Sequence, residues 1–111
     1  MKIYNELESL GFFEWLSETH NLKDTDMTPE HLDKLPLNDI HRTVCDSMAF
    51  RWFREKYQID SWIYPNLNGL YSVSNVRRGI GLGKVSEYQT YEEAELECLK
   101  QLINIVKNKK Q

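Results

Sequence analysis

The sequence predicts an α+β domain in which a helix, a three-stranded antiparallel sheet and a second helix follow short N-terminal helices. Three observations predict this fold class. Apolar residues have helical spacing over 3–10 and again over 40–57, alternating residues with turn signals occupy 59–88, and a capped amphipathic helix begins at residue 90. With 111 residues and 41% hydrophobic content, the chain is expected to form a single domain over 1–111.

Residues 1–46 are predicted to be an acidic, mainly helical N-terminal part. Ile3, Leu7 and Leu10 are spaced for one helix face, and an aromatic cluster follows Gly11. We therefore expect one or two short helices ending near residue 17. The polar residues 17–27 are expected to form a loop. Thr28-Pro29 then predicts the start of a short helix, which Pro36 ends.

Residues 47–107 are predicted to form the α-β-β-β-α unit. Its first helix begins near residue 39 or 46 and runs through Tyr57. Strands are expected over 59–65, 70–76 and 84–88, with a turn at 66–69 and a second turn or a bulged strand edge at 77–83. The last helix has the clearest start signal, because Thr90 and Glu93 form a capping box before a broad apolar stripe. Residues 108–111 are expected to be a basic tail.

Charge divides unevenly along the chain. Residues 1–47 carry a net charge of −6 and residues 48–111 carry +3. Either the surface charges simply fall unevenly, or the acidic part folds over, or pairs in a dimer with, the basic part. The chain has no apolar run long enough to cross a bilayer, and Cys45 and Cys98 are expected to be buried free thiols. We expect a cytoplasmic location without membrane association.

No catalytic, cofactor or metal site is predicted. The run Gly79–Lys84 lacks the spacing of a phosphate-binding loop and leads into a strand, so it is expected to connect two strands. His41 and Cys45 are only two potential metal ligands. The carboxylates of Glu92, Glu93, Glu95 and Glu97 are explained by helix capping and a solvated helix face. We therefore expect a non-enzymatic protein.

A cationic loop supports one alternative function. Arg77, Arg78 and Lys84 flank the glycine run and are candidate contacts to a phosphate backbone. The order helix, three strands, helix is also that of double-stranded RNA-binding domains. In those domains the second helix opens with basic residues, whereas here it opens with Glu92-Glu93. The acidic helix start and the pI of about 5.6 argue against this alternative.

Two segments of the chain carry a resemblance. They are Ala-Phe-Arg-Trp-Phe-Arg-Glu-Lys-Tyr at 49–57 and Thr-Tyr-Glu-Glu-Ala-Glu at 90–95, continued by Cys98-Leu99 and Leu102-Ile103. The combination resembles small proteins of gut-bacterial prophages, and the arrangement is similar to the phage-type "ABA sandwich" domain. The resemblance covers residues 47–107. It implies a phage or mobile-element origin and a helix–sheet–helix fold, and it assigns no functional residue.

The combined expectation is an accessory or protein-interaction module. Exposed aromatic residues can mark a partner surface, and Trp62 and Tyr64, together with Trp15, are the candidates. The open alternative is that these aromatics only fill a small core. The partner is expected to be another protein or a second copy of the chain, paired through a sheet edge or a helix face. Double-stranded nucleic acid stays the alternative partner.

Overall fold

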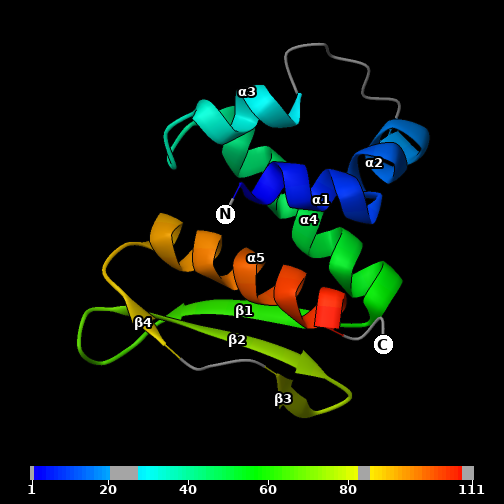
Figure 1. Ribbon diagram of the computed structural model, residues 1–111. Helices are drawn as coiled ribbons and strands as arrows, with labels where there is room; N and C mark the ends of the chain where they lie inside the picture. The colour runs from blue at the N-terminus through cyan, green and yellow to red at the C-terminus, as the bar shows by residue number, and fades with distance from the viewer. Residues whose placement is uncertain (1, 21–27, 83–85, 109–111) are drawn as a thin grey trace.

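The computed structural model describes residues 2–20, 28–82 and 86–108, and it confirms the α+β fold class (Figure 1). The helices and strands in these residues are α1 (Ile3–Leu10), α2 (Phe12–His20), α3 (Pro29–Lys34), α4 (Ile40–Tyr57), β1 (Asp60–Pro65), β2 (Tyr71–Arg77), β3 (Ile80–Leu82), β4 (Glu87–Tyr88) and α5 (Tyr91–Asn108). The helix–sheet–helix unit, α4 to α5, follows three short helices as expected.

The elements form three layers (Figure 1). Helices α1, α2 and α3 lie over α4 and α5, which in turn lie over one face of the sheet. The main core fills the space between the helical layers and includes Tyr4, Trp52 and Leu102. A smaller cluster around Val73 and Cys98 joins α5 to the sheet. Because all described helices lie on the same side, the opposite face of the sheet carries no described helix.

Local signals in the sequence explain where the helices begin. Thr28 accepts a hydrogen bond from the N–H of His31 at the start of α3, and Thr90 accepts one from Glu93 at the start of α5. Asp39 caps α4, so this helix begins at the earlier of the two expected positions. Gly11, with φ at 100°, ends α1 in the left-handed conformation. Helix α2 reaches residue 20, slightly beyond its expected end.

The predicted third strand is the main difference between expectation and structure. β3 lies at 80–82, within the segment expected to be a turn or a bulged strand edge, and β4 is the short piece 87–88. Both pair with β2, while β1 pairs with the other side of β2. Arg78 and Gly79 have φ of 52° and 80°, which produces a tight turn and lets pairing resume at Ile80. Residues 83–85 lie outside the described part of the chain.

The acidic N-terminal helices pack on the rest of the molecule. Helix α1 lies against both α3 and α5, and Glu6 forms an ion pair with Lys107 at 2.6 Å. The backbone N–H of Tyr4 donates to Asp33 at 3.3 Å and joins α1 to α3. The acidic part therefore folds over the C-terminal helix within one chain. Trp15 is half-buried against this core and is no isolated surface ring.

Candidate interaction surface

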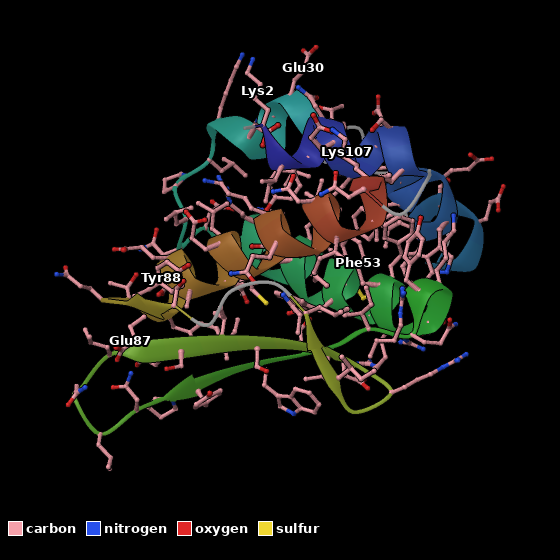
Figure 2. All side chains as sticks on the ribbon, turned by 60° about the horizontal axis from the view of Figure 1, so that its bottom comes forward. Lys2, Glu30, Phe53, Glu87, Tyr88 and Lys107 are labelled. Carbon is pink, nitrogen blue, oxygen red and sulfur yellow. The ribbon has the colours of Figure 1, made fainter. Side chains whose placement is uncertain are left out.

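The uncovered face of the sheet carries exposed aromatic side chains. Trp62 is 52% exposed and Tyr64 is 44% exposed, and they alternate along β1 on the same face. Opposite them on β2 are Ser74 and Ser72, whose small side chains leave the rings uncovered. In Figure 2 the sheet lies below the helices, and the helices drawn there lie on one side of it. The expectation that Trp62 and Tyr64 are surface aromatics is consistent with this arrangement.

The outer edge of β1 has free hydrogen-bonding groups. The N–H of Asn66 donates to the carbonyl of Leu70 at 2.8 Å, and these residues lie in the same register as the β1–β2 pairs. Hydrogen-bonded and non-hydrogen-bonded pairs alternate in an antiparallel ladder. The backbone groups of Trp62 and Tyr64 therefore face β2, and those of Ser61 and Ile63 face outward. No described strand pairs with this outward side.

Pro65 lies at a position of β1 where a proline does not disrupt the pairing with β2. It shares the outward orientation of Ser61 and Ile63, so its missing N–H removes no bond of the β1–β2 ladder. Its carbonyl still points outward as an acceptor. The edge thus presents two N–H donors and three carbonyl acceptors over residues 61–65.

A hollow of about 230 Å³ lies beneath this edge, on the helical side of the sheet. Its walls come from α4, β1 and α5 and consist of Ser47, Phe50, Ser61, Ile63, Tyr91 and Glu95. On the outer side of α4, Ile40 and Val44 are 71% and 50% exposed. α4 therefore carries apolar residues on its outer side as well as on the sides that pack against other elements.

The cationic loop is placed differently from the aromatic face. Arg77 donates from Nε to the carbonyl of Tyr57 at 3.0 Å, and Arg78 is exposed in the turn before β3. With Lys56 they line a hollow of about 330 Å³ at the C-terminal end of α4. Lys84 lies outside the described residues. The structure therefore brings Arg77 and Arg78 together, with Arg77 engaged in holding β2 to α4.

A buried polar cluster connects α1, α4 and α5. The Tyr4 hydroxyl donates to Asp46, and Asp46 and Glu95 hydrogen-bond to one another. Burial raises the pKa of Asp46, while the hydrogen bond from Tyr4 and the charge of Arg42 oppose that rise. Burial and the neighbouring Asp46 charge raise the pKa of Glu95. Because two buried negative charges would repel one another, these two carboxyl groups keep one proton between them.

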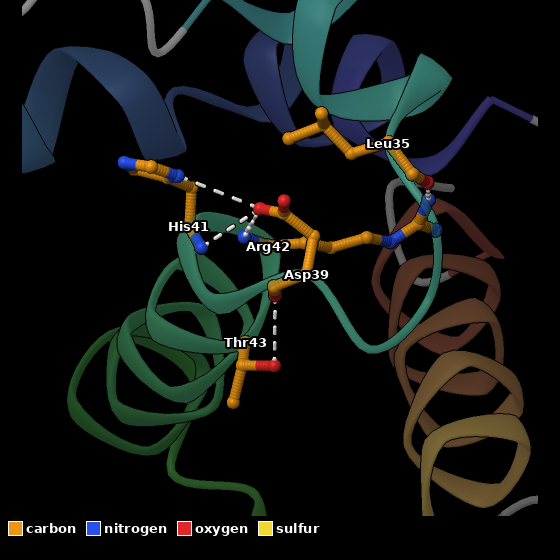
Figure 3. A network of polar contacts seen from close by, with 5 residues as sticks. All are labelled: Leu35, Asp39, His41, Arg42 and Thr43. Atoms are coloured by element: carbon orange, nitrogen blue, oxygen red, sulfur yellow. Dashed lines mark hydrogen bonds and ion pairs between the residues drawn. The ribbon is translucent and has the colours of Figure 1, made fainter.

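Arg42 is the cation of this cluster. It is 6% exposed, and its guanidinium lies 5.1 Å from the centre of the Tyr4 ring. Figure 3 shows its donation to the carbonyl of Leu35 at 2.9 Å, beside the cap that Asp39 forms on α4. Arg42 therefore fixes the α3–α4 connection at the same time as it neutralises the buried acids.

Two sequence-based interpretations need correction or detail here. Glu95 is 5% exposed, so a solvated helix face does not explain it, whereas Glu93 is exposed as expected. His41 is exposed beside Asp39, but Cys45 is buried, so these two side chains share no open site. In the described part of the chain, no three His, Cys, Asp or Glu side chains are placed to hold a metal ion.

Sequence reasoning did not find the buried acids, the hollow or the free backbone groups. A signal for Glu95 exists in hindsight, because it lies between Ala94 and Cys98 at the edge of the apolar stripe of α5. Both cysteines are free and buried as expected. Burial raises the pKa of the Cys98 thiol to about 11, which makes this thiol unreactive.

Comparison of the chain with protein-family models, curated proteins and solved structures found no match. Within the described residues, every helix is too short or too polar to span a membrane.

Proposed function

We propose that this protein is a non-enzymatic interaction module that binds an extended polypeptide segment along β1. The observation that supports this proposal is the unpaired edge of β1 beside the exposed rings of Trp62 and Tyr64. Addition of a strand to a free sheet edge gives affinity through main-chain hydrogen bonds, and side-chain contacts give specificity. The two rings can cover alternate side chains of the added strand.

The composition of β1 favours the same function. Proteins usually protect exposed sheet edges with charged side chains, bulges or a covering loop. Residues 61–66 carry no charge, and Pro65 near the end is the one edge-protecting residue among them. An edge of this kind is suited to pairing with another strand. The accessory role in a phage or mobile element that the resemblance implies is compatible with such a module.

Binding of double-stranded RNA through Arg77, Arg78 and Lys84 is the second candidate. The hollow that Arg77 and Arg78 line with Lys56 is the observation in its favour. Two features weaken it. The hollow lies at the C-terminal end of α4, where the helix dipole is negative, and Glu92 and Glu93 open α5.

A selection from a library of displayed random peptides tests the main proposal. We expect enriched peptides whose binding is lost in the Ile63→Pro variant, because proline removes the outward N–H without breaking a β1–β2 bond. Ile63→Ala is the matched control: it loses the same side chain, keeps the N–H and should keep binding. Peptides that bind wild type and Ile63→Pro equally would contradict the proposal.

The same material tests the alternative. Titration with a duplex RNA should leave the protein unbound at physiological salt. Salt-sensitive binding that is lost in the triple variant Arg77→Ala, Arg78→Ala, Lys84→Ala would support nucleic-acid binding instead.

A further inference from the structure

We infer that the strand accepted by β1 is β1 of a second copy of this chain, in a two-fold symmetric dimer with Ile63 on the axis. This inference rests on the proposed function, because it uses the same edge. It adds the identity of the partner and the register of the pairing. The dimer has one continuous sheet running through both copies.

The hydrogen-bonding groups of the edge fit this register. With Ile63 opposite Ile63 of the second copy, the two residues exchange both backbone bonds. Ser61 then lies opposite the partner's Pro65 and donates to its carbonyl, in both directions. The pairing forms four main-chain hydrogen bonds. Pro65 has no N–H, and the two outward N–H groups of each copy, those of Ser61 and Ile63, are both paired. The whole segment 61–65 is used.

The side chains are complementary to themselves in this register. Rotation about an axis perpendicular to the sheet keeps each face on its own side, so Trp62 lies directly opposite Tyr64 of the second copy. The two symmetric ring pairs cover the exposed aromatic face of both copies. On the helical face, Ile63 of the second copy lies beside Ile63 and extends toward the hollow bounded by Ser47 and Phe50.

Charge is compatible with this partner. The facing segments 61–66 are uncharged, and Asp60 lies opposite Asn66 of the second copy. No like charges meet along the paired strands. A register centred on Trp62 also forms four hydrogen bonds, but it places Asp60 opposite a tyrosine and leaves the strand ends unpaired.

The available area predicts a weak dimer. Trp62, Tyr64 and Tyr91 are each about half exposed, which leaves on the order of 100 Å² of surface on each ring. The edge backbone and the exposed Val44 of α4 add to these three rings. The total stays below the roughly 800 Å² per partner of a standard interface. We therefore expect a weak dimer that forms only at high protein concentration.

Disulfide trapping reads the register directly. Chains carrying Trp62→Cys are mixed with chains carrying Tyr64→Cys at about 100 µM under mild oxidation, and products are separated on a non-reducing gel. Directly opposed residues lie about 4.5 Å apart between Cα atoms, within disulfide range. We expect a covalent dimer in the mixture and none from either variant alone, since equal positions lie about 7–8 Å apart diagonally. Cys45 and Cys98 are buried and do not interfere.

The outcomes separate the two proposals. Sedimentation equilibrium of the wild type should show a concentration-dependent dimer that Ile63→Pro abolishes and Ile63→Ala retains. Cross-linking of Trp62→Cys alone would overturn the register. A wild type that stays monomeric at 200 µM would overturn the dimer, while peptides dependent on the Ile63 N–H would still support strand addition by a different polypeptide.

Discussion

Glu95 is the residue whose environment is most unusual in this molecule. It lies on α5 at the boundary between the polar face and the apolar stripe, and it is 5% exposed. Its carboxyl group contacts Asp46, which also accepts from Tyr4 and lies near Arg42. A single cation thus serves two buried acids. The cluster is satisfied only when one of the acids keeps its proton.

The shared proton predicts a pH dependence of stability. Burial, together with the neighbouring Asp46, raises the pKa of Glu95 from its ordinary value of 4.5 to about 7. Between these values the unfolded chain releases a proton that the folded chain keeps, so the contribution of Glu95 is present at low pH and is lost as pH rises. Glu95→Gln keeps a donor to Asp46 and cannot ionise. We expect it to match wild type near pH 5 and to exceed it by on the order of 1–3 kcal/mol near pH 8.

The measurement is urea denaturation of both proteins at the two pH values. Glu97→Gln is the control, because Glu97 lies on the same helix and pairs with Lys100 near the surface. Its stability difference from wild type should vary little with pH. Equal destabilisation of Glu95→Gln at pH 5 and pH 8 would contradict the shared-proton interpretation.

At the scale of elements, α4 determines how the layers meet. Its buried side faces α2 and α5, its flank meets β1, and its outer side exposes Ile40 and Val44. Tertiary packing stabilises most of α4, whereas its first turn depends on hydrogen bonds from nearby side chains. Asp39 supplies them by accepting from the N–H of His41 at 2.9 Å and from that of Arg42 at 3.4 Å.

Removal of this cap should destabilise the protein. Asp39→Ala leaves two N–H groups of the first turn without their side-chain acceptor, and we expect a loss of about 0.5–2 kcal/mol in the free energy of unfolding. Asp39→Ser retains a capping oxygen and should lose less. Urea titration followed by far-UV circular dichroism measures both. A serine variant as unstable as the alanine variant would show that the carboxylate acts in another way.

Elements with local signals were predictable, including the β1–β2 hairpin with its Asn/Gly turn, whereas the split of the third strand was not. Three helix starts could be predicted from their capping residues, Thr28, Asp39 and Thr90, because capping is a short-range interaction. The split of the third strand depends on β2, which is long enough to pair with two separate segments. Likewise, the position of Glu95 at the edge of the apolar stripe of α5 was a weak local signal, and its burial follows from α1 and α4 meeting α5.

At the scale of the whole molecule, the helical layers share one hydrophobic core. Ile3, Tyr4 and Leu7 of α1 are buried with Trp52 of α4 and Leu102 of α5 in one cluster. The N-terminal helices therefore complete the core of the helix–sheet–helix unit. This arrangement also explains the uneven charge, since acidic α1 faces the basic end of α5 through Glu6 and Lys107.

A cavity in α1 should therefore destabilise the entire protein. Leu7 is fully buried, and Leu7→Ala is expected to cost about 2–5 kcal/mol. Far-UV circular dichroism and tryptophan fluorescence should shift to lower urea together, because both follow the same transition. Glu8→Ala, on the exposed side of the same helix, should change stability by less than about 0.5 kcal/mol. Separate transitions for the two probes would show that α1–α3 fold independently.

The central position of α5 has a consequence for the order of folding during synthesis. Both hydrophobic clusters take residues from α5, which lies near the end of this sequence, while Ile3 and Tyr4 lie near its beginning. Until α5 leaves the ribosome, α1 can pack against α3 and α4 against β1, but the apolar surfaces of α1, α4 and the sheet that α5 covers stay exposed. β1 and its neighbours therefore lack their helical cover until α5 has been synthesised, and we expect the complete core to form only after that point.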